Sequence, residues 1–427
     1  LGGAANVALN CQSLGARVTF LTLLGQDKWG EWAQEALAGF GIETDGIVTS
    51  ATRKTSVKSR VVTNNQQIVR LDSEHTHALD EREHRLLLAA YERVLPQVDV
   101  VVVSDYAKGV VGDALIRAII RLAKVNAKAV LVDPKGSDYT KYSGATLLSP
   151  NRKEAELVLQ QTLTTQADIE TALVTMREQF HLDYALITLS EQGVACYDGE
   201  SFYHEPTQSV AVHDVTGAGD TFIATCACFI AQQQPLRQVL SLANMAATLA
   251  VSKAGNATIG FFDLYEHLSK QDERSKLLSL EAMQTVRNCI EQPVVFTNGC
   301  FDLLHVGHIS YLKQARALGG FLIVAVNSDD SVRRLKGEHR PINSLADRMH
   351  MLAAYDFVDA VISFDAQTPY DVIAALKPDI LVKGADYRPE DIVGADLVEA
   401  THVLAFVPGK STSNIIKKMQ TEQVDVS

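Results

Sequence analysis

The sequence lacks any long hydrophobic run and any concentrated block of positive charge. None of its 427 residues falls in an uncharged apolar stretch of about 18 residues, so no transmembrane helix is expected. Lys and Arg number 39 against 51 Asp and Glu, which gives a formal net charge of −12. We therefore expect neither nucleic acid nor a membrane as a partner, although a local cationic pocket for a small phosphorylated molecule stays compatible with this balance.

Cysteine is also scarce, and its spacing matches no metal or disulfide framework. The six cysteines form no CxxC pair; they are Cys11, Cys196, Cys226, Cys228, Cys289 and Cys300. We interpret them as buried free thiols, which fits a reducing cytoplasm. No secretory signal is recognisable at the start. Because Leu1 leads directly into Gly2-Gly3, as in the middle of a domain, we expect a further segment before it.

Over residues 1–265, the sequence alternates regularly between apolar, strand-like runs and segments of helical periodicity. Such alternation is typical of a parallel sheet with helices on both faces. The predicted strands are 98–104, 129–133, 146–149 and 184–188, and the predicted helices include 111–125 and 236–251. Two further runs, 55–62 and 67–71, flank Asn64-Asn65 and predict a small β-hairpin that serves as a lid or a dimer contact.

A second α/β unit follows this domain. Residues 266–290 are rich in polar side chains, and we interpret them as a helical linker. From 291 to 427, five short apolar runs alternate with helical segments, which predicts one doubly wound, Rossmann-like domain. The predicted strands are 294–297, 321–327, 358–362, 380–383 and 403–406. The fold class is therefore α/β in both domains.

The strongest chemical signal of the first domain is the string DVTGAGDTF at 214–222. Gly217 and Gly219 allow a tight turn, so the amides that follow, including that of Ala218, would face an anion at a helix N-terminus. The carboxylate of Asp220 can take a proton from an attacking hydroxyl. An anion hole beside a base suits phosphoryl transfer to an alcohol; an ordinary strand-to-helix turn is the plainer alternative. The flanking elements predicted are a strand at 209–213 and a helix at 222–232.

This string resembles the second signature of the ribokinase-like (PfkB) family of carbohydrate kinases. The string GGAANVA at 2–8 resembles the first signature of the same family. The resemblance covers residues 1–265 and implies a three-layer ribokinase-like fold, with ATP as co-substrate, Mg²⁺ as cofactor and Asp220 as the catalytic base. In that family a first strand with a sugar-binding Asp would precede Leu1.

The same resemblance implies ligand-binding roles for further residues of the first domain. Asn151 and Glu154 resemble an Asn-x-x-Glu element near Mg²⁺, which Glu154 would approach indirectly. An ordinary acid in the first turn of a helix is the alternative for Glu154. The implied sugar-side residues are Gly2, Gly3 and Asn6, and the implied anion hole is Ala218 and Gly219. The other residues implied to bind nucleotide or phosphate are Gly217, Thr188, Glu191, Gly193 and Gly255.

The second domain opens on a different motif, VVFTNGCFDLLHVGH at 294–308. An apolar strand leads into a turn at Gly299 and then into His-x-Gly-His at the start of a helix. His305 and His308 are three residues apart, so they share one helix face. Two imidazoles at a helix N-terminus can stabilise charge on an α-phosphate and a leaving pyrophosphate. A zinc site would require a third ligand, and two incidental histidines are the plainest alternative.

This motif resembles the cytidylyltransferase-like nucleotidyltransferase superfamily over residues 290–427. Lys336, in a cationic cluster with Arg340 close by, would bind a triphosphate or a sugar phosphate; a solvated charged face is the alternative. The resemblance implies nucleotide or phosphate binding for Asn298, Gly299, Phe301, Lys336, Lys383, Ser411, Thr412 and Ser413.

The combination of the two domains resembles the bacterial bifunctional enzymes of ADP-heptose synthesis for the lipopolysaccharide core. It implies phosphorylation of heptose 7-phosphate at the anomeric hydroxyl, then transfer of AMP from ATP to heptose 1-phosphate. Arg70 and Lys108 are basic residues in non-helical stretches near the sugar side, so we expect one of them to bind the 7-phosphate; a solvated charge is the alternative for each. We expect sugar phosphates and ATP as ligands, a homodimer formed through the kinase domain, and a cytoplasmic location.

Three alternatives remain at the level of the sequence. The chain could join another sugar kinase to a cytidylyltransferase. It could be a binding protein with decayed sites, although Asp220, His305 and His308 are intact. It could also be a fragment in which only the nucleotidyltransferase is active.

Overall fold

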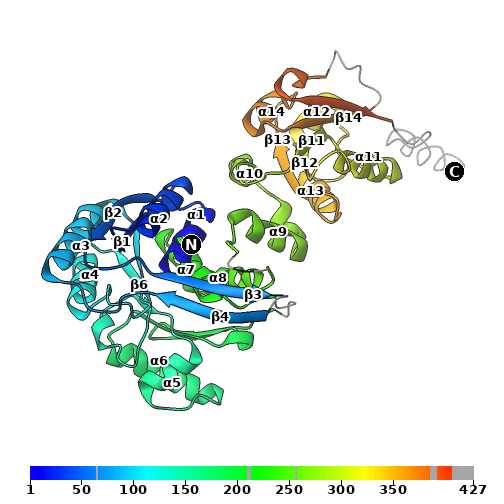
Figure 1. Cartoon of the computed structure of the whole chain (residues 1–427). Helices are drawn as coiled ribbons and strands as arrows, with labels where there is room; N and C mark the ends of the chain where they lie inside the picture. Colours follow the sequence, from blue (N-terminus) through cyan, green and yellow to red (C-terminus); the bar gives the residue numbers. More distant parts are fainter. Residues whose placement is uncertain (64–65, 209–212, 254, 256, 385–391, 406–427) are drawn as a thin grey trace, which may run out of the picture. The chain divides into compact units, whose positions relative to one another are not determined.

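The chain forms two compact units, Leu1–Gly260 and Phe261–Ser427, and each is described by itself. The computed structural model describes residues 1–63, 66–208, 213–253, 255, 257–384 and 392–405 (Figure 1). Within these residues, no helix combines the length and the apolar character that a membrane span requires.

A six-stranded sheet in the order β10-β9-β8-β7-β6-β5 forms the centre of the first unit. Neighbouring strands from β5 to β8 run parallel, and β9 and β10 are antiparallel. The bounds are β5 Val100–Ser104, β6 Ala129–Asp133, β7 Leu147–Leu148, β8 Tyr184–Thr188, β9 Val194–Tyr197 and β10 Phe202–Glu205. The strands predicted at 98–104, 129–133, 146–149 and 184–188 are confirmed, with ends that shift by at most two residues. Of the strand predicted at 209–213, residues 209–212 lie outside the described residues.

Two smaller sheets complete the strands of the first unit. β1 (Thr19–Gly25) and β2 (Glu43–Ser50) form a parallel pair. β3 (Val57–Thr63) and β4 (Gln66–Ser73) form an antiparallel hairpin, which confirms the predicted one. The predicted turn residues Asn64 and Asn65 lie outside the described residues.

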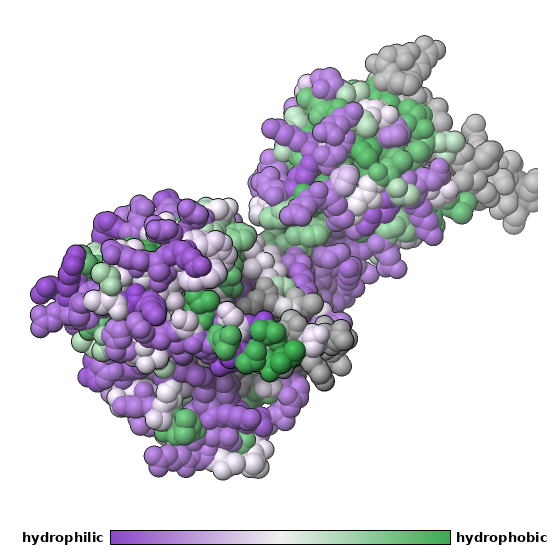
Figure 2. Space-filling view, viewed as in Figure 1, coloured by the Kyte–Doolittle hydropathy of each residue, from purple (hydrophilic) through white to green (hydrophobic). Residues whose placement is uncertain are grey.

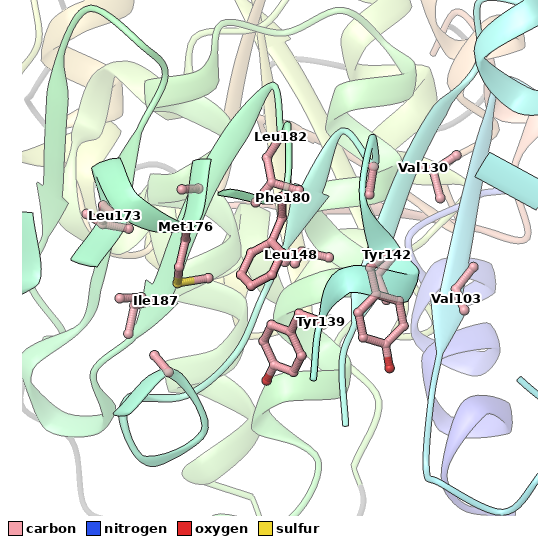
Figure 3. Packing of buried hydrophobic residues seen from close by; sticks show 14 of the residues in the cluster. Val103, Val130, Tyr139, Tyr142, Leu148, Leu173, Met176, Phe180, Leu182 and Ile187 are labelled. Carbon is pink, nitrogen blue, oxygen red and sulfur yellow. The ribbon is translucent and has the colours of Figure 1, made fainter. Parts of the chain in front are cut away.

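Helices cover both faces of the six-stranded sheet, because its strands are apolar on both sides. On β6, Val130 and Val132 pack with α3, α4 and α6, whereas Leu131 faces α1, α7 and α8. Figure 3 shows the first of these clusters, with Tyr139, Tyr142 and Phe180 beside Leu148. The helix bounds are α1 Ala4–Ser13, α2 Lys28–Gly39, α3 Glu81–Val94, α4 Asp113–Val125, α5 Arg152–Leu159, α6 Gln166–Gln179, α7 Ala218–Ala231 and α8 Leu236–Val251. The predicted three-layer architecture is confirmed.

The second unit contains five parallel strands in the order β13-β12-β11-β14-β15. Successive residues of β12 alternate between two cores: Ile323 packs with α10 and α14, and Val324 with α11 and α13. The strand bounds are β11 Val294–Gly299, β12 Phe321–Asn327, β13 Ala360–Phe364, β14 Ile380–Gly384 and β15 Ala400–Leu404, and the helix bounds are α11 Val306–Arg316, α12 Asp329–Lys336, α13 Leu345–Ala353 and α14 Tyr370–Leu376. The doubly wound prediction is confirmed.

The predicted linker differs from the structure. Residues 266–290 contain most of α9 (Phe261–Gln271) and all of α10 (Leu280–Arg287), and both helices belong to the second unit. Tyr265, Met283 and Val286 are buried in the same core as strands β11 to β14. Their apolar faces need a partner, so this segment packs on the second sheet instead of spanning freely between domains.

Candidate active sites

The first candidate site lies at the N-terminus of α7. Gly217 precedes the helix with a φ of 84°, a left-handed conformation that glycine adopts without a steric penalty. The helix therefore begins at Ala218, four residues before the predicted start. Among the described residues, no side chain caps this end, and no atom lies within 4 Å of the Cβ position that Gly219 lacks. First-turn amides have no acceptor within their own helix, so this turn offers donors to an anion.

Asp220 lies in this first turn with 8% of its surface exposed. The Tyr106 hydroxyl donates to Oδ1 at 2.8 Å, and Asn6 Nδ2 donates to Oδ2 at 2.9 Å. Burial raises the pKa of the Asp220 carboxyl, and the hydrogen bonds from Asn6 and Tyr106 oppose that rise. The residue predicted as a base is thus a buried carboxylate held at both oxygens.

The Gly-rich string at the start of the chain adjoins the same carboxylate. Gly3 precedes α1 with a φ of 59°, and the ring of Tyr106 lies against it: a Cβ at Gly3 would stand 3.4 Å from Cε2. Asn6 is buried on α1 and reaches Asp220 directly. One turn later, Asn10 Oδ1 accepts a hydrogen bond from Thr221 Oγ1 at 3.2 Å. These contacts fix α1 against α7.

A cavity of about 1330 Å³ opens in front of these groups. It also extends between apolar side chains of β1 and β5. Its polar lining includes Gly2, Lys58, Arg60, Lys108, Asp133 and Asp220. The cavity thus joins the candidate base to cations of the hairpin and of the loop after β5.

Asp133, at the end of β6, is a feature that the sequence reasoning did not assign. Burial raises the pKa of its carboxyl to about 7, and the nearby charges of Asp220 and Glu154 add to the rise, while Lys135 opposes it. The carboxylates of Asp133 and Asp220 therefore lie close together in the site, and the charge of one opposes ionisation of the other.

This raised pKa predicts how the stability of the first unit depends on pH. Asp133 has an ordinary pKa of 3.8, so between pH 4 and 7 the folded chain holds a proton that the unfolded chain has released. Stability therefore falls as the pH rises through this interval. We expect Asp133→Asn to raise the melting temperature of the first unit at pH 8 and to change it less at pH 5. Equal changes at both pH values would contradict this assignment.

Asn151 and Glu154 form the N-terminus of α5. Asn151 Oδ1 accepts from the Glu154 amide, and Glu154 Oε2 accepts from the Asn151 amide, each at 3.0 Å. Glu154 Oε1 also pairs with Lys135 Nζ at 2.5 Å. Glu154 is therefore an acid in the first turn of a helix, which was the alternative considered from the sequence, and it forms a reciprocal capping box with Asn151.

The other residues implied for nucleotide binding occupy strand ends and turns. Thr188 ends β8 and forms an isolated bridge with Asn151. Glu191 is exposed in a short 3₁₀ turn. Gly193 follows with a φ of 89°, and a Cβ there would lie 1.9 Å from the carbonyl oxygen of Glu205, so no other residue fits. Gly255 has a φ of 72° and open space around its Cβ position.

The two residues predicted for the 7-phosphate differ in position. Lys108 lines the cavity and forms an ion pair with Glu74. Arg70 lies on β4, where it pairs with Asp72 at 3.0 Å, and it is not among the residues that line this cavity. Arg60, its cross-strand partner on β3, does line the cavity.

The second candidate site lies where the strand order of the second sheet reverses. β11 pairs with β12 on one side and with β14 on the other. In open α/β sheets, ligands bind beyond the carboxyl ends of the strands at such a point. There Asn298 Oδ1 of β11 accepts a hydrogen bond from the buried Lys383 of β14. Asn298 and Lys383, which are both implied to bind nucleotide, therefore contact each other at the point where the strand order reverses.

His305 and His308 lie at the N-terminus of α11, beyond Gly299. His305 caps the helix, with Nδ1 accepting from the Gly307 amide at 3.2 Å. The two imidazole rings stack with centroids 4.0 Å apart. Burial lowers the pKa of His308 to about 4, and His305 adds to the shift. His308 is therefore neutral at pH 7, and its Nδ1 is buried with no hydrogen-bond partner in the described residues.

Buried side chains fix the loop between β11 and α11. Phe301 is buried with a φ of 47°, and its ring lies 5.5 Å from that of His308. Asp302 is buried, pairs with Arg340 and accepts from the Ile342 amide at 2.7 Å. Arg340 therefore supports the loop instead of lying free for a phosphate.

Arg348, on α13, is another residue that the sequence reasoning missed. It is fully buried, donates to the carbonyls of Cys300 and Asn327, and pairs with Asp329 at 2.7 Å. These bonds join the ends of β11 and β12 to the start of α12. No motif marks such a residue, because its partners converge only in the folded chain.

The remaining predicted residues of the second site fall into two groups. Lys336 is exposed at the end of α12, after a helix that begins with Asp329 and Asp330. Ser411, Thr412 and Ser413 lie outside the described residues. In the part of the chain that the structure describes, no three His, Cys, Asp or Glu side chains gather in a way that could hold a metal ion.

Comparison with known proteins agrees with both halves of this description. A pfkB family carbohydrate kinase model matches residues 1–259, and a cytidylyltransferase-like model matches residues 296–420. The fold of the first unit resembles phosphofructokinase-2 from Escherichia coli in complex with potassium, with a TM-score of 0.54 and 22% identity over 62% of this chain and 85% of that one. The fold and the sites thus define a carbohydrate kinase joined to a nucleotidyltransferase.

Relatives named as bifunctional proteins match nearly the whole chain. A bifunctional protein HldE of Campylobacter jejuni is 45% identical over 99% of this chain and 90% of its own length. Another, from Helicobacter hepaticus, is 41% identical over 99% of this chain and 89% of its own length. The chain belongs to the family of bifunctional HldE proteins. It is an enzyme of ADP-heptose synthesis with a kinase and an adenylyltransferase activity, as the order of its motifs predicted.

Proposed function

We propose that the first unit phosphorylates the anomeric hydroxyl of heptose 7-phosphate, with Asp220 as the general base. The observation that carries this role is a buried carboxylate, held by two donors, in the first turn of a helix that opens onto a large cavity. The sugar O–H bond breaks as the oxygen attacks the γ-phosphorus of ATP. The proton passes to Asp220, and the bond to the ADP oxygen breaks.

The N-terminus of α7 stabilises the phosphoryl group during this transfer. Its first-turn amides and the helix dipole favour negative charge, and the missing side chain of Gly219 lets phosphate oxygens approach the backbone. These donors are fixed before the substrate arrives, so they need no reorganisation as charge develops.

Mg²⁺ fits this site as a companion of ATP. The metal is usually held by one or two carboxylates together with substrate phosphates, so a complete protein cage is not required. Glu154 and Asp133 supply carboxylates close to each other, since the charge of Glu154 contributes to the raised pKa of Asp133. The ion, when bound, neutralises charge on the transferring phosphates.

The 7-phosphate binds to cations at the hairpin side of the cavity. Lys108, Lys58 and Arg60 all line it. Arg60 lies near the loop that leads into α7, since its charge helps to lower the pKa of Asp214, after the hydrogen bonds from Thr216. Guanidinium groups suit phosphate because they donate two parallel hydrogen bonds.

This assignment makes a prediction about substrate selectivity. We expect Arg60→Gln to raise the KM for heptose 7-phosphate by about tenfold or more, and to reduce the preference over unphosphorylated heptose. Arg117→Gln, on the exposed side of α4, is the matched control. Initial rates of ADP formation measure both effects. An unchanged preference in Arg60→Gln would remove Arg60 from the phosphate subsite.

The second unit transfers AMP from ATP to heptose 1-phosphate. A sugar-phosphate oxygen attacks the α-phosphorus, the bond to the β-phosphate breaks, and pyrophosphate leaves. A phosphate monoester is already a competent nucleophile, so the site needs positioning and charge stabilisation instead of a strong base. His305, His308 and the N-terminus of α11 provide these around Gly307. Because the two substrates differ by the 7-phosphate, a phosphatase reaction must separate the two steps.

We also propose that the chain forms a homodimer through its kinase unit and works in the cytoplasm. Val61, Ile68, Val69 and Leu71 are exposed on the hairpin, and green side chains gather over β3 and β4 in Figure 2. Such a patch on a two-stranded ribbon favours contact with a second apolar surface. All six cysteines are free thiols, but only four are buried: Cys289 is exposed and Cys300 is half-buried, so the prediction of burial is wrong for these two. Free thiols suit a reducing compartment. Light scattering on the purified chain tests the dimer.

A substrate panel on the full chain tests the proposed reactions together. ADP formation is measured with heptose 7-phosphate and other sugars, and pyrophosphate release with ATP or CTP and several sugar 1-phosphates. We expect ADP from heptose 7-phosphate, and pyrophosphate only from ATP with heptose 1-phosphate. Pyrophosphate from CTP, or from another sugar phosphate, would overturn the named substrates while leaving the chemistry of the sites intact.

A further inference from the structure

Tyr106 lies where it can control the carboxylate of Asp220. Its hydroxyl donates to Oδ1 at 2.8 Å, while Asn6 holds Oδ2. The donor and the acceptor are 114 residues apart, so the bond depends on the tertiary fold. The tyrosine also lines the cavity, with 37% of its surface exposed. It is therefore a polar group at the reaction centre for which the mechanism above gives no role.

The loop that carries Tyr106 is anchored on both sides. Before it, the buried Asp105 accepts from the Ala107 amide at 2.7 Å and pairs with Lys141 at 2.6 Å. After it, the Lys108 carbonyl accepts from the buried Arg53 at 2.9 Å. The ring itself lies against Gly3. The position of the hydroxyl is thus set by the scaffold and does not depend on Asp220 alone.

We propose that Tyr106 is a positioning residue of the kinase reaction, which holds the Asp220 carboxylate in the rotamer that accepts the sugar proton. This inference rests on the proposed role of Asp220 as the base. Each carboxylate oxygen has two acceptor sites, so the bonds from Tyr106 and Asn6 fix the group and leave sites for the substrate hydroxyl. Tyr106 keeps its own proton throughout, because burial and the charge of Asp220 raise the pKa of its hydroxyl. The proton lost by the sugar therefore ends on Asp220.

The hydrogen bond has a second consequence for the ionisation of the base. A bond donated to a carboxylate favours its charged form, and here it opposes the effect of burial. The titratable groups that face this carboxylate are Tyr106, from the loop after β5, and Asp133, from the end of β6. Loss of the hydroxyl therefore raises the pKa of Asp220, and a larger fraction of the enzyme is protonated and inactive at a given acidic pH.

The test compares Tyr106→Phe with the parent chain, using ADP formation from heptose 7-phosphate between pH 5 and 9. We expect kcat to fall about 10- to 100-fold and the acid limb of the kcat/KM profile to move to higher pH, with little change in the KM for ATP. Tyr203→Phe is the matched control, because Tyr203 donates to Asp198 at the same 2.8 Å but does not line the cavity. Pyrophosphate release by the second unit reports that the chain is intact.

Two further variants keep the proposal open to refutation. If Tyr106→Phe does not fold, 3,5-difluorotyrosine at position 106 retains the ring and makes the hydroxyl a stronger donor; we then expect the acid limb to move to lower pH. Asp220→Asn separates this proposal from the role of the base. If Asp220→Asn loses kinase activity while Tyr106→Phe keeps the parent rate and pH profile, the positioning role alone is overturned. A chain that stays active in Asp220→Asn overturns the base itself.

Discussion

Replacing Asp220 by Asn is expected to lower the kinase turnover by about 10²- to 10⁴-fold, the range that a general base contributes. Asparagine has nearly the same shape and still accepts hydrogen bonds through one oxygen, but it cannot take the proton of the sugar hydroxyl. The buried position of Asp220 and its two donors mean that water replaces it poorly. ADP formation from heptose 7-phosphate under saturating ATP measures the loss.

The second activity of the same chain is the internal control for this experiment. Asp220 lies in the first unit, Leu1–Gly260, and the adenylyltransferase motif lies in the second. We expect pyrophosphate release by Asp220→Asn to stay at the parent rate. Asp113→Asn is the matched variant, since Asp113 also occupies the first turn of a helix but is exposed. A fall in ADP formation as large in Asp113→Asn as in Asp220→Asn would show a general effect on the fold.

Replacing His308 by Asn is expected to lower pyrophosphate release by about 10²- to 10³-fold, the loss typical of a donor aimed at developing charge. The lowered pKa of about 4 makes His308 neutral at pH 7, so it acts as an uncharged hydrogen-bond donor. A bound triphosphate adds negative charge beside the stacked imidazoles, which raises the pKa of His308 and strengthens that donor. The rate of pyrophosphate release from ATP with heptose 1-phosphate measures this effect.

His402→Asn is the control for the second prediction. His402 lies on β15 of the same unit and is exposed. We expect it to leave both activities unchanged, and we expect His308→Asn to leave ADP formation by the first unit unchanged. An unaltered rate of pyrophosphate release in His308→Asn would remove this histidine from the mechanism.

Much of the fold was predictable because both sheets are apolar on two faces. Runs such as 129–133 and 321–327 are nearly continuous in hydrophobic residues, and buried parallel strands require this. The strings that carry chemistry were predictable for a related reason. A phosphate-binding turn needs its glycines, its base and its helix start within a few residues, so the whole arrangement around Asp220 can be recognised from one short string.

Other parts of the sites could not be predicted from local sequence. Tyr106 contacts Asp220 across 114 residues of sequence. The pKa of Asp133 is raised only because the folded chain buries this carboxyl near the charges of Asp220 and Glu154. Arg348 binds carbonyls at the ends of two strands. A single tyrosine, aspartate or arginine in the sequence carries no sign of such partners. The same limit explains the linker: the polar residues of 266–290 are visible in the sequence, but the surface that buries Met283 is not.

The helices α9 and α10 have a consequence for how genes encoding such enzymes can be recombined. Their buried side chains, including Tyr265, Met283 and Val286, complete the core of the second sheet. A crossover at residue 288 would separate these two helices from the sheet that they cover. Each large side chain lost from such a core lowers the free energy of unfolding by about 2–5 kcal/mol. The natural junction for exchanging one kinase for another therefore lies before Phe261, and a transplanted adenylyltransferase must bring both helices with it.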